Sequence, residues 1–135
     1  MRVTTLGFPR IGQRRELKKA LEQYWEGKLP ADTLLDTARG LRRRHWELQR
    51  DAGADTVPVN DFSLYDHVLD TAWLFDAVPE PYRELAEMIP LDGYFASARG
   101  HRAEGHDLRA LEMTKWFDTN YHYIVPELRR AGTGA

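Results

Sequence analysis

The fold is decided at residues 7–19, which read Gly7-Phe8-Pro9-Arg10-Ile11-Gly12-Gln13-Arg14-Arg15-Glu16-Leu17-Lys18-Lys19. This stretch is typical of a strand end, a turn punctuated by glycine and proline, and a helix that begins among cations. From Leu17 onward the apolar residues keep the i, i+3, i+4, i+7, i+8 spacing of one helical face, at Leu17, Ala20, Leu21, Tyr24 and Trp25. The spacing predicts a helix that ends near Gly27.

Four cations crowd the start of this helix: Arg14, Arg15, Lys18 and Lys19. The helix dipole favours negative charge at this end, and the cations would also form two like-charged i, i+4 pairs. An anion docked at the free backbone N–H groups and these side chains would explain the pattern. A solvated basic face beside an acidic neighbour would explain it as well, so the spacing alone leaves both interpretations open.

Composition indicates one globular domain, with 42% apolar and 30% charged residues in a chain of 135. The absence of cysteine excludes disulfides, thiolate nucleophiles and cysteine metal sites within the chain. No apolar run approaches the roughly 20 residues that span a bilayer, and the N-terminus carries no apolar signal segment, so we expect a cytoplasmic protein without a membrane partner. The net charge of −2 divides into +6 for residues 1–50 and −8 for the remainder, which favours a local anion site over general nucleic-acid binding.

The rest of the chain alternates predicted strands and helices. We expect buried strands at residues 3–6, 55–59 and 121–125, and helices at 31–52, 63–75, 82–88 and 94–99. Residues 100–107 are expected to form a polar surface loop, and residues 129–135 a disordered tail. This order describes parallel βα units of an α/β fold, in which ligands lie at the carboxyl ends of the strands.

Several local details accompany these elements. Ser63 is the expected N-cap of the third helix, with Asp66 three residues later as in a capping box. Asn60 suits a left-handed turn after the second strand. Residues 42–44, three consecutive arginines, spread around the second helix and are interpreted mainly as solvated surface.

Isolated polar residues offer weaker candidates for chemistry. Asp61 and Glu127 follow predicted strands and could act as acid or base, although single carboxylates are common there. Lys115, flanked by Trp116 and Phe117, could place its ammonium beside an aromatic surface, or could be an ordinary exposed lysine. Asp66, His67 and Asp70 on a predicted helix, or His101 and His106 in a predicted loop, could bind a metal, with structural or surface histidines as the alternative. No complete nucleophile–base constellation is present, so we assign no catalytic residue.

Taken together, the motifs resemble the N-terminal region of the cobalamin-independent methionine synthase family. The resemblance begins with residues 6–12 and 14–20 and continues through 44–46, 57–71, 94–96 and 98–100 to 112–123. It runs in consistent order from about Thr4 to Glu127. We therefore expect residues 1–128 to be the first part of the family's N-terminal barrel, and residues 129–135 to be a divergent tail.

The resemblance implies a methyltransferase that moves a methyl group from 5-methyltetrahydropteroyltri-L-glutamate to L-homocysteine, giving L-methionine. It implies a fold of two (βα)8 barrels, of which this chain would be a partial (βα)8 barrel. It also implies that the N-terminal barrel helps to bind the polyglutamate tail of the folate through Arg15, Glu16, Leu17, Lys18 and Lys115. A chain of carboxylates is an anion of the kind that the cations at residues 14–19 would attract.

The resemblance also implies a zinc ion in the complete enzyme, held in the C-terminal barrel by His, Glu and two Cys. Because this chain has no cysteine and about half the roughly 250 residues of one barrel, we expect it to bind no metal and to be inactive alone. Its partners would be the folate polyglutamate and the remainder of the synthase. The alternative is a stand-alone anion-binding or assembly module without catalysis.

Overall fold

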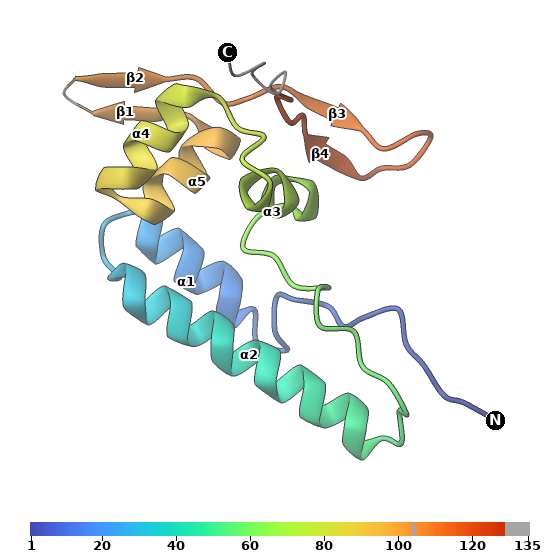
Figure 1. Ribbon diagram of the computed structural model, residues 1–135. Coiled ribbons are helices and arrows are strands. Elements are labelled where there is room, and N and C mark those ends of the chain that lie inside the picture. Colours follow the sequence, from blue (N-terminus) through green and yellow to red (C-terminus); the bar gives the residue numbers. More distant parts are fainter. Residues whose placement is uncertain (104, 129–135) are drawn as a thin grey trace, which may run out of the picture. The chain divides into compact units, whose positions relative to one another are not determined.

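The computed structural model describes residues 1–103 and 105–128, and these divide into two compact units, Met1–Leu64 and the residues from Tyr65 onward. The first unit contains α1 (Glu16–Trp25) and α2 (Ala31–Asp51). The second contains α3 (His67–Leu74), α4 (Glu80–Met88), α5 (Pro90–Arg99) and four three-residue strands, β1 (His101–Ala103), β2 (His106–Leu108), β3 (Met113–Lys115) and β4 (His122–Ile124) (Figure 1). Each unit is described by itself.

The first unit is a helical hairpin in which α1 packs along α2 (Figure 1). The predicted face of α1 buries Leu17, Ala20 and Leu21, and the helix ends just before Gly27 as the sequence predicts. On α2 the buried stripe runs through Leu34, Ala38, Leu41, His45 and Gln49. Leu48, which the helical spacing from Leu34 and Leu41 would also place on this face, is instead 51% exposed. Gln49 takes the inward position because its side chain bonds the Thr5 hydroxyl (2.5 Å) and the His45 carbonyl (3.0 Å).

The first two predicted strands are reduced to one parallel bridge, between Thr4 and Thr56. The Asp55 N–H donates to the Val3 carbonyl (2.9 Å), and the Asp55 carboxylate accepts the Val3 N–H (2.6 Å). The direction of pairing is the expected one, yet the prediction of buried strands is wrong: Leu6 is fully exposed and Val59 is 71% exposed. Asn60 is also not left-handed; in the described chain the non-glycine residues with positive φ are Arg15, Asp76 and Phe117.

The third helix begins later than the sequence predicts. Its N-cap is Asp66, whose carboxylate accepts the Leu69 N–H (2.9 Å), and not Ser63. Ser63 is 2% exposed and its hydroxyl has no hydrogen-bond partner among the described residues. The helix ends at Leu74, close to the predicted end, but Leu74 is 78% exposed, so the helix is buried on one side only.

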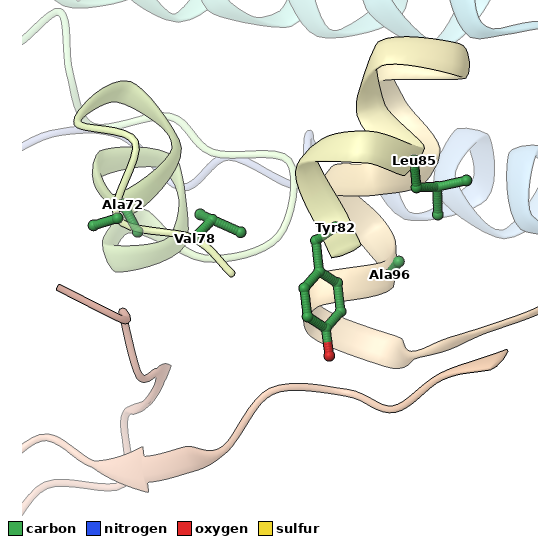
Figure 2. Packing of buried hydrophobic residues seen from close by; sticks show 6 residues of the cluster. Ala72, Val78, Tyr82, Leu85 and Ala96 are labelled. Atoms are coloured by element: carbon green, nitrogen blue, oxygen red, sulfur yellow. The ribbon is translucent and has the colours of Figure 1, made fainter. Parts of the chain in front are cut away.

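The core of the second unit is an apolar cluster that joins α3, α4 and α5. Its buried members are Ala72, Ala77, Val78, Tyr82, Leu85 and Ala96, most of them visible in Figure 2. A second cluster of Leu69, Ala98 and Ile124 places β4 against α3 and α5. The two predicted short helices are confirmed as α4 and α5, and each has a proline in its first turn, where the missing N–H costs no helical hydrogen bond.

Both sheets are antiparallel hairpins, β1 with β2 and β3 with β4. The prediction of a polar loop at residues 100–107 is therefore wrong, since most of these residues form the β1–β2 hairpin. The strand predicted at residues 121–125 exists as β4, but it pairs antiparallel with β3 and not in a parallel sheet. Over residues 1–103 and 105–128 the fold is mixed α/β with no closed barrel, and no helix there is long and apolar enough to cross a membrane. The tail predicted at residues 129–135 lies outside the described residues.

Candidate functional site: a basic turn at the start of α1

The residues predicted to bind the polyglutamate tail fall into both units. Arg15, Glu16, Leu17 and Lys18 are consecutive at the start of α1 in the first unit. Lys115 ends β3 in the second unit. The geometry of each is therefore built up separately.

The backbone before α1 forms a closed turn. The Arg15 N–H donates to the Gly12 carbonyl and the Leu17 N–H to the Ile11 carbonyl, both at 3.0 Å. Arg15 is the N-cap of α1 and has a left-handed backbone, with φ 60° and ψ 36°. Such conformations are costly for a residue with a Cβ and persist only where the surrounding bonds enforce them. The turn therefore holds the exposed Arg15 side chain on a fixed backbone.

Two positions before α1 need glycine because a carboxylate lies where a Cβ would be. A Cβ on Gly12 would come within 2.2 Å of a Glu16 carboxylate oxygen and 2.9 Å of the Leu41 side chain. A Cβ on Gly7 would come within 2.9 Å of the Asp61 carboxylate, which accepts the Phe8 N–H at 2.8 Å. Asp61 thus has a structural role that its position after a predicted strand did not reveal.

Glu16 is the anion that the start of α1 already contains. One of its carboxylate oxygens accepts the Arg14 N–H and the other accepts from the Arg44 guanidinium, each at 2.9 Å. The hydrogen bond from Arg44, together with backbone N–H groups, lowers the pKa of Glu16 to about 2. Arg44 is exposed, as expected of residues 42–44, but it also forms this ion pair with Glu16. Twenty-eight residues separate it from Glu16, and no local pattern signals the pairing.

The other cations of the turn remain available to a ligand. Within the described chain no ion pair engages Arg14, Arg15 or Lys19, and Lys18 meets Glu22 only at 3.6 Å with both side chains about half exposed. Because α1 begins at Glu16, Arg14 lies outside the helix, and the predicted like-charge clash between Arg14 and Lys18 as helical neighbours does not arise. Leu17 is fully buried and anchors the basic residues on either side of it.

A buried histidine lies beneath this turn. The ring of His45 stacks on Phe8, with ring centroids 4.4 Å apart, and His45 is 5% exposed. Burial, with a smaller contribution from Arg44, lowers the pKa of His45. The stack joins the turn to α2, so His45 supports the site and is not exposed to a ligand.

Lys115 lies on an exposed hairpin beside an aromatic group. Trp116 contacts Phe117 and Tyr123 edge to face, at centroid distances of 5.3 and 5.6 Å. Lys115 itself is exposed and lies opposite His122 in the β3–β4 register. The cation is thus presented at the end of a short strand.

The metal hypotheses are not supported by the positions of their residues. The Asp66 carboxylate accepts the Leu69 N–H, the Ile124 N–H (3.2 Å) and the Tyr121 hydroxyl, and Asp70 accepts the Tyr94 hydroxyl. Within residues 1–103 and 105–128 no three His, Asp or Glu side chains converge on a possible metal position. With no cysteine in the sequence, the described residues do not fit the zinc set that the resemblance implies.

The second acid–base candidate, Glu127, is exposed, and its N–H donates to the Ala77 carbonyl (3.0 Å). It belongs to the second unit, whereas Asp61 belongs to the first. The structure therefore gives Asp61 a structural role, whereas Glu127 contributes a backbone hydrogen bond and an exposed side chain.

Comparison with known proteins decides the family. Residues 2–133 match the family described as cobalamin-independent synthase, N-terminal domain. The chain belongs to the cobalamin-independent synthase family. A Xylella fastidiosa relative (strain 9a5c) is 70% identical over 128 residues, and relatives from Mesorhizobium japonicum and Streptomyces avermitilis are each 57% identical, over 140 and 127 residues. All three are named 5-methyltetrahydropteroyltriglutamate–homocysteine methyltransferase.

The matches cover most of this chain and little of each relative. They include 95%, 93% and 94% of the chain but only 17%, 18% and 16% of the respective relatives. The chain thus spans about a sixth of the length of the synthases it matches. The family predicted from the motifs is confirmed.

Proposed function

We propose that this chain is the N-terminal part of a methyltransferase that transfers a methyl group from 5-methyltetrahydropteroyltri-L-glutamate to L-homocysteine, and that it helps to bind the glutamate tail. The observation that carries the proposal is the closed turn before α1, which presents exposed arginine and lysine side chains on a fixed backbone. The relatives' printed name supplies the anion, a triglutamate.

The five proposed residues have different parts in this binding. Arg15 and Lys18 would meet tail carboxylates directly, because their side chains are exposed at the start of α1. Glu16 would keep the turn in shape through Arg44 and the Arg14 N–H, and Leu17 would anchor it in the core. Lys115 would bind a further carboxylate from the β3–β4 hairpin.

The chain is proposed to bind the tail without performing the transfer. In the complete enzyme a zinc ion would activate the homocysteine thiol as a thiolate. We propose that the zinc and homocysteine sites, and the rest of the synthase, belong to the part of the relatives that this chain does not span. A cytoplasmic location follows from the same assignment.

We also propose that residues 1–128 correspond to the first βα units of a (βα)8 barrel. The parallel bridge between Thr4 and Thr56 supports this, because adjacent barrel strands run parallel and Thr4 and Thr56 stand in two successive predicted strands. Gly7 and Asp61 follow those two strands, so the basic turn would lie at the carboxyl end of the sheet, where barrel ligands bind.

Titration of the chain with 5-methyltetrahydropteroyltriglutamate and with the monoglutamate tests the proposal. We expect tighter binding of the triglutamate, and a loss of about ten-fold or more in its affinity in Lys18→Ala and in Lys115→Ala, from about 1.5 kcal/mol per charged hydrogen bond. High salt should reduce the affinity, since exposed charges are screened.

Lys28→Ala is the matched control, because Lys28 follows α1 and pairs with Glu26 at 2.7 Å, away from the turn. It should leave the affinity unchanged. Isothermal titration calorimetry measures both ligands against all four proteins. Equal affinities of the unaltered chain for the triglutamate and the monoglutamate would contradict the proposal.

A further inference from the structure

The register of the β3–β4 hairpin places two basic side chains directly opposite each other. Lys115 pairs with His122, Thr114 with Tyr123 and Met113 with Ile124. The backbone bonds run from the Trp116 N–H to the Tyr121 carbonyl (2.8 Å) and from the Val125 N–H to the Glu112 carbonyl (2.9 Å). Hydrogen-bonded and non-hydrogen-bonded pairs alternate along an antiparallel ladder, so Lys115 and His122 form a non-hydrogen-bonded pair. In such pairs the side chains share a face and lie closest together.

The hairpin around this pair is held by its own hydrogen bonds. The Thr119 hydroxyl donates to the Trp116 carbonyl (2.6 Å) and the Thr119 N–H donates to the same oxygen (3.1 Å). The Tyr121 hydroxyl donates to Asp66 before α3. Lys115 ends β3 and His122 begins β4, so both lie at the turn end of the β3–β4 hairpin, whose backbone is drawn in Figure 1.

The His122 ring is oriented toward solvent by its own turn. Its Nδ1 lies 3.1 Å from the Asn120 carbonyl oxygen, which can only accept, so Nδ1 carries the proton of that bond. This leaves Nε2 as the free nitrogen, and it becomes a second donor when the imidazole is protonated. Lys115 and His122 are both exposed, and no ion pair engages either of them within the described residues.

We propose that His122 is a second tail-binding residue, which together with Lys115 clamps a carboxylate of the triglutamate between the two strands. This inference rests on the proposed function, since it takes the ligand from it. The facing side chains of Lys115 and His122 share one face of the hairpin, so a carboxylate bound there would accept a hydrogen bond from the Lys115 ammonium and another from a protonated imidazole. The proposed clamp thus gives the facing pair of basic residues a ligand.

The test compares His122→Gln, which removes the charge, with His122→Lys, which keeps a cation at the same strand position. The affinities of the 135-residue chain for 5-methyltetrahydropteroyltriglutamate and for the monoglutamate are measured by calorimetry at pH 6.0 for every variant. We expect His122→Gln to lower the preference for the triglutamate about five-fold, the size of an exposed ion pair, and His122→Lys to retain it. His101→Gln, the same change on the other hairpin, is the matched control and should have no effect.

The outcomes separate the inference from the proposed function. If the unaltered chain and His122→Gln show the same preference for the triglutamate, the clamp is refuted while tail binding by Lys18 and Lys115 stands. If His122→Lys loses as much preference as His122→Gln, the ring is structural and the clamp is again refuted. If the unaltered chain shows no preference for the triglutamate, the proposed function and the clamp both fail. Circular dichroism verifies that each variant keeps the helical content of the unaltered chain.

Discussion

The two units use buried and half-buried carboxylates in different ways. In residues 1–64 the carboxylates of Glu16 and Asp61 lie against glycines, and each fixes a backbone turn. In the second unit Asp66 is 5% exposed and gathers donors from three places in the chain, Leu69, Tyr121 and Ile124. The stability of the first unit therefore depends on the backbone conformation of its turns. The stability of the second unit depends on one buried acceptor, the Asp66 carboxylate, together with its packed apolar side chains.

The two regions that carry proposed tail-binding residues are therefore supported in different ways. The basic turn before α1 is set by glycines and a left-handed arginine, so its cations keep their places without deep burial. The hairpin that carries Lys115 is closed by its own hydrogen bonds and is attached to α3 through Asp66 and Ile124. Substitution of a turn glycine should therefore destabilise the first unit and leave the second unchanged. Substitution of Asp66 should destabilise the second unit and leave the first unchanged.

The largest effect is expected for Asp66→Ala. Removing the carboxylate leaves the Leu69 and Ile124 N–H groups and the Tyr121 hydroxyl without their acceptor, which should cost about 3–4 kcal/mol in the second unit. Burial, with the Asp66 charge, raises the pKa of Tyr121 to about 12, so its hydroxyl remains a donor at neutral pH. Amide hydrogen exchange should show faster exchange in α3 and β4, with α1 and α2 unchanged.

Asp66→Asn provides the graded control, because an amide oxygen still caps α3 while the charge is gone. Asp66→Asn should lower the stability of the second unit by less than Asp66→Ala does. Equal acceleration of exchange in α1 and α2 would contradict the idea that the two units depend on separate supports.

The next effect is expected for Gly12→Ala in the first unit. Gly12 has φ +88°, which an alanine adopts at a cost, and the added Cβ would collide with Glu16 and Leu41. We expect a loss of about 2 kcal/mol, measured by urea unfolding, together with weaker binding of the triglutamate. The matched control is Gly40→Ala on α2, where nothing lies within 4 Å of the new Cβ, and it should stabilise the chain by about 0.5–1 kcal/mol. If both substitutions destabilised the chain equally, the close approach of Glu16 to Gly12 would not be the reason.

The helices were predictable from the sequence because their signals are local. The spacing from Leu17 to Trp25 predicted α1. The two short helices were predicted to start at residues 82 and 94, but α4 and α5 begin earlier, at Glu80 and Pro90, because a proline fits the first turn of a helix. The errors at helix starts arose where two residues compete for a cap. Ser63 and Asp66 both suit an N-cap, and Asp66 has this role because its carboxylate also receives the β4 backbone, a contact 58 residues away.

The strands were predicted less well because strand pairing is decided by residues distant in sequence. Residues 3–6 and 55–59 have the apolar pattern of buried strands, yet only Thr4 and Thr56 pair, and Leu6 has no cover. The aromatic stretch at 121–125 does form a strand, but its partner is residues 113–115, reached by a short turn and not by a helical crossover.

The cations of the candidate site can be identified from the sequence, but their partners cannot. The crowding at residues 14–19 left open an external anion and an acidic neighbour, and the structure contains an acidic partner, Glu16, in the same stretch. Its pairing with Arg44 and the contact of Asp61 with Gly7 join segments that no periodic pattern connects. Arg14, Arg15 and Lys19 have no ion-pair partner within the described chain and therefore remain available to an external anion.

The smallest expected effect is a loss of stability in the first unit as the pH falls. Burial lowers the pKa of His45 from its ordinary value of 6.5, so the unfolded chain binds a proton there more readily than the folded chain does. This contribution to stability is complete above pH 6.5 and declines as the pH falls below it. Glu16, whose pKa falls from 4.5 to about 2, adds nothing to the change above pH 5, because it is ionised in both states there. Between pH 8 and pH 5, protection of α1 and α2 amides, corrected for intrinsic exchange, should therefore decrease, and His45→Gln should flatten the decrease. A decrease that persists in His45→Gln would assign the acid sensitivity of the first unit to another group.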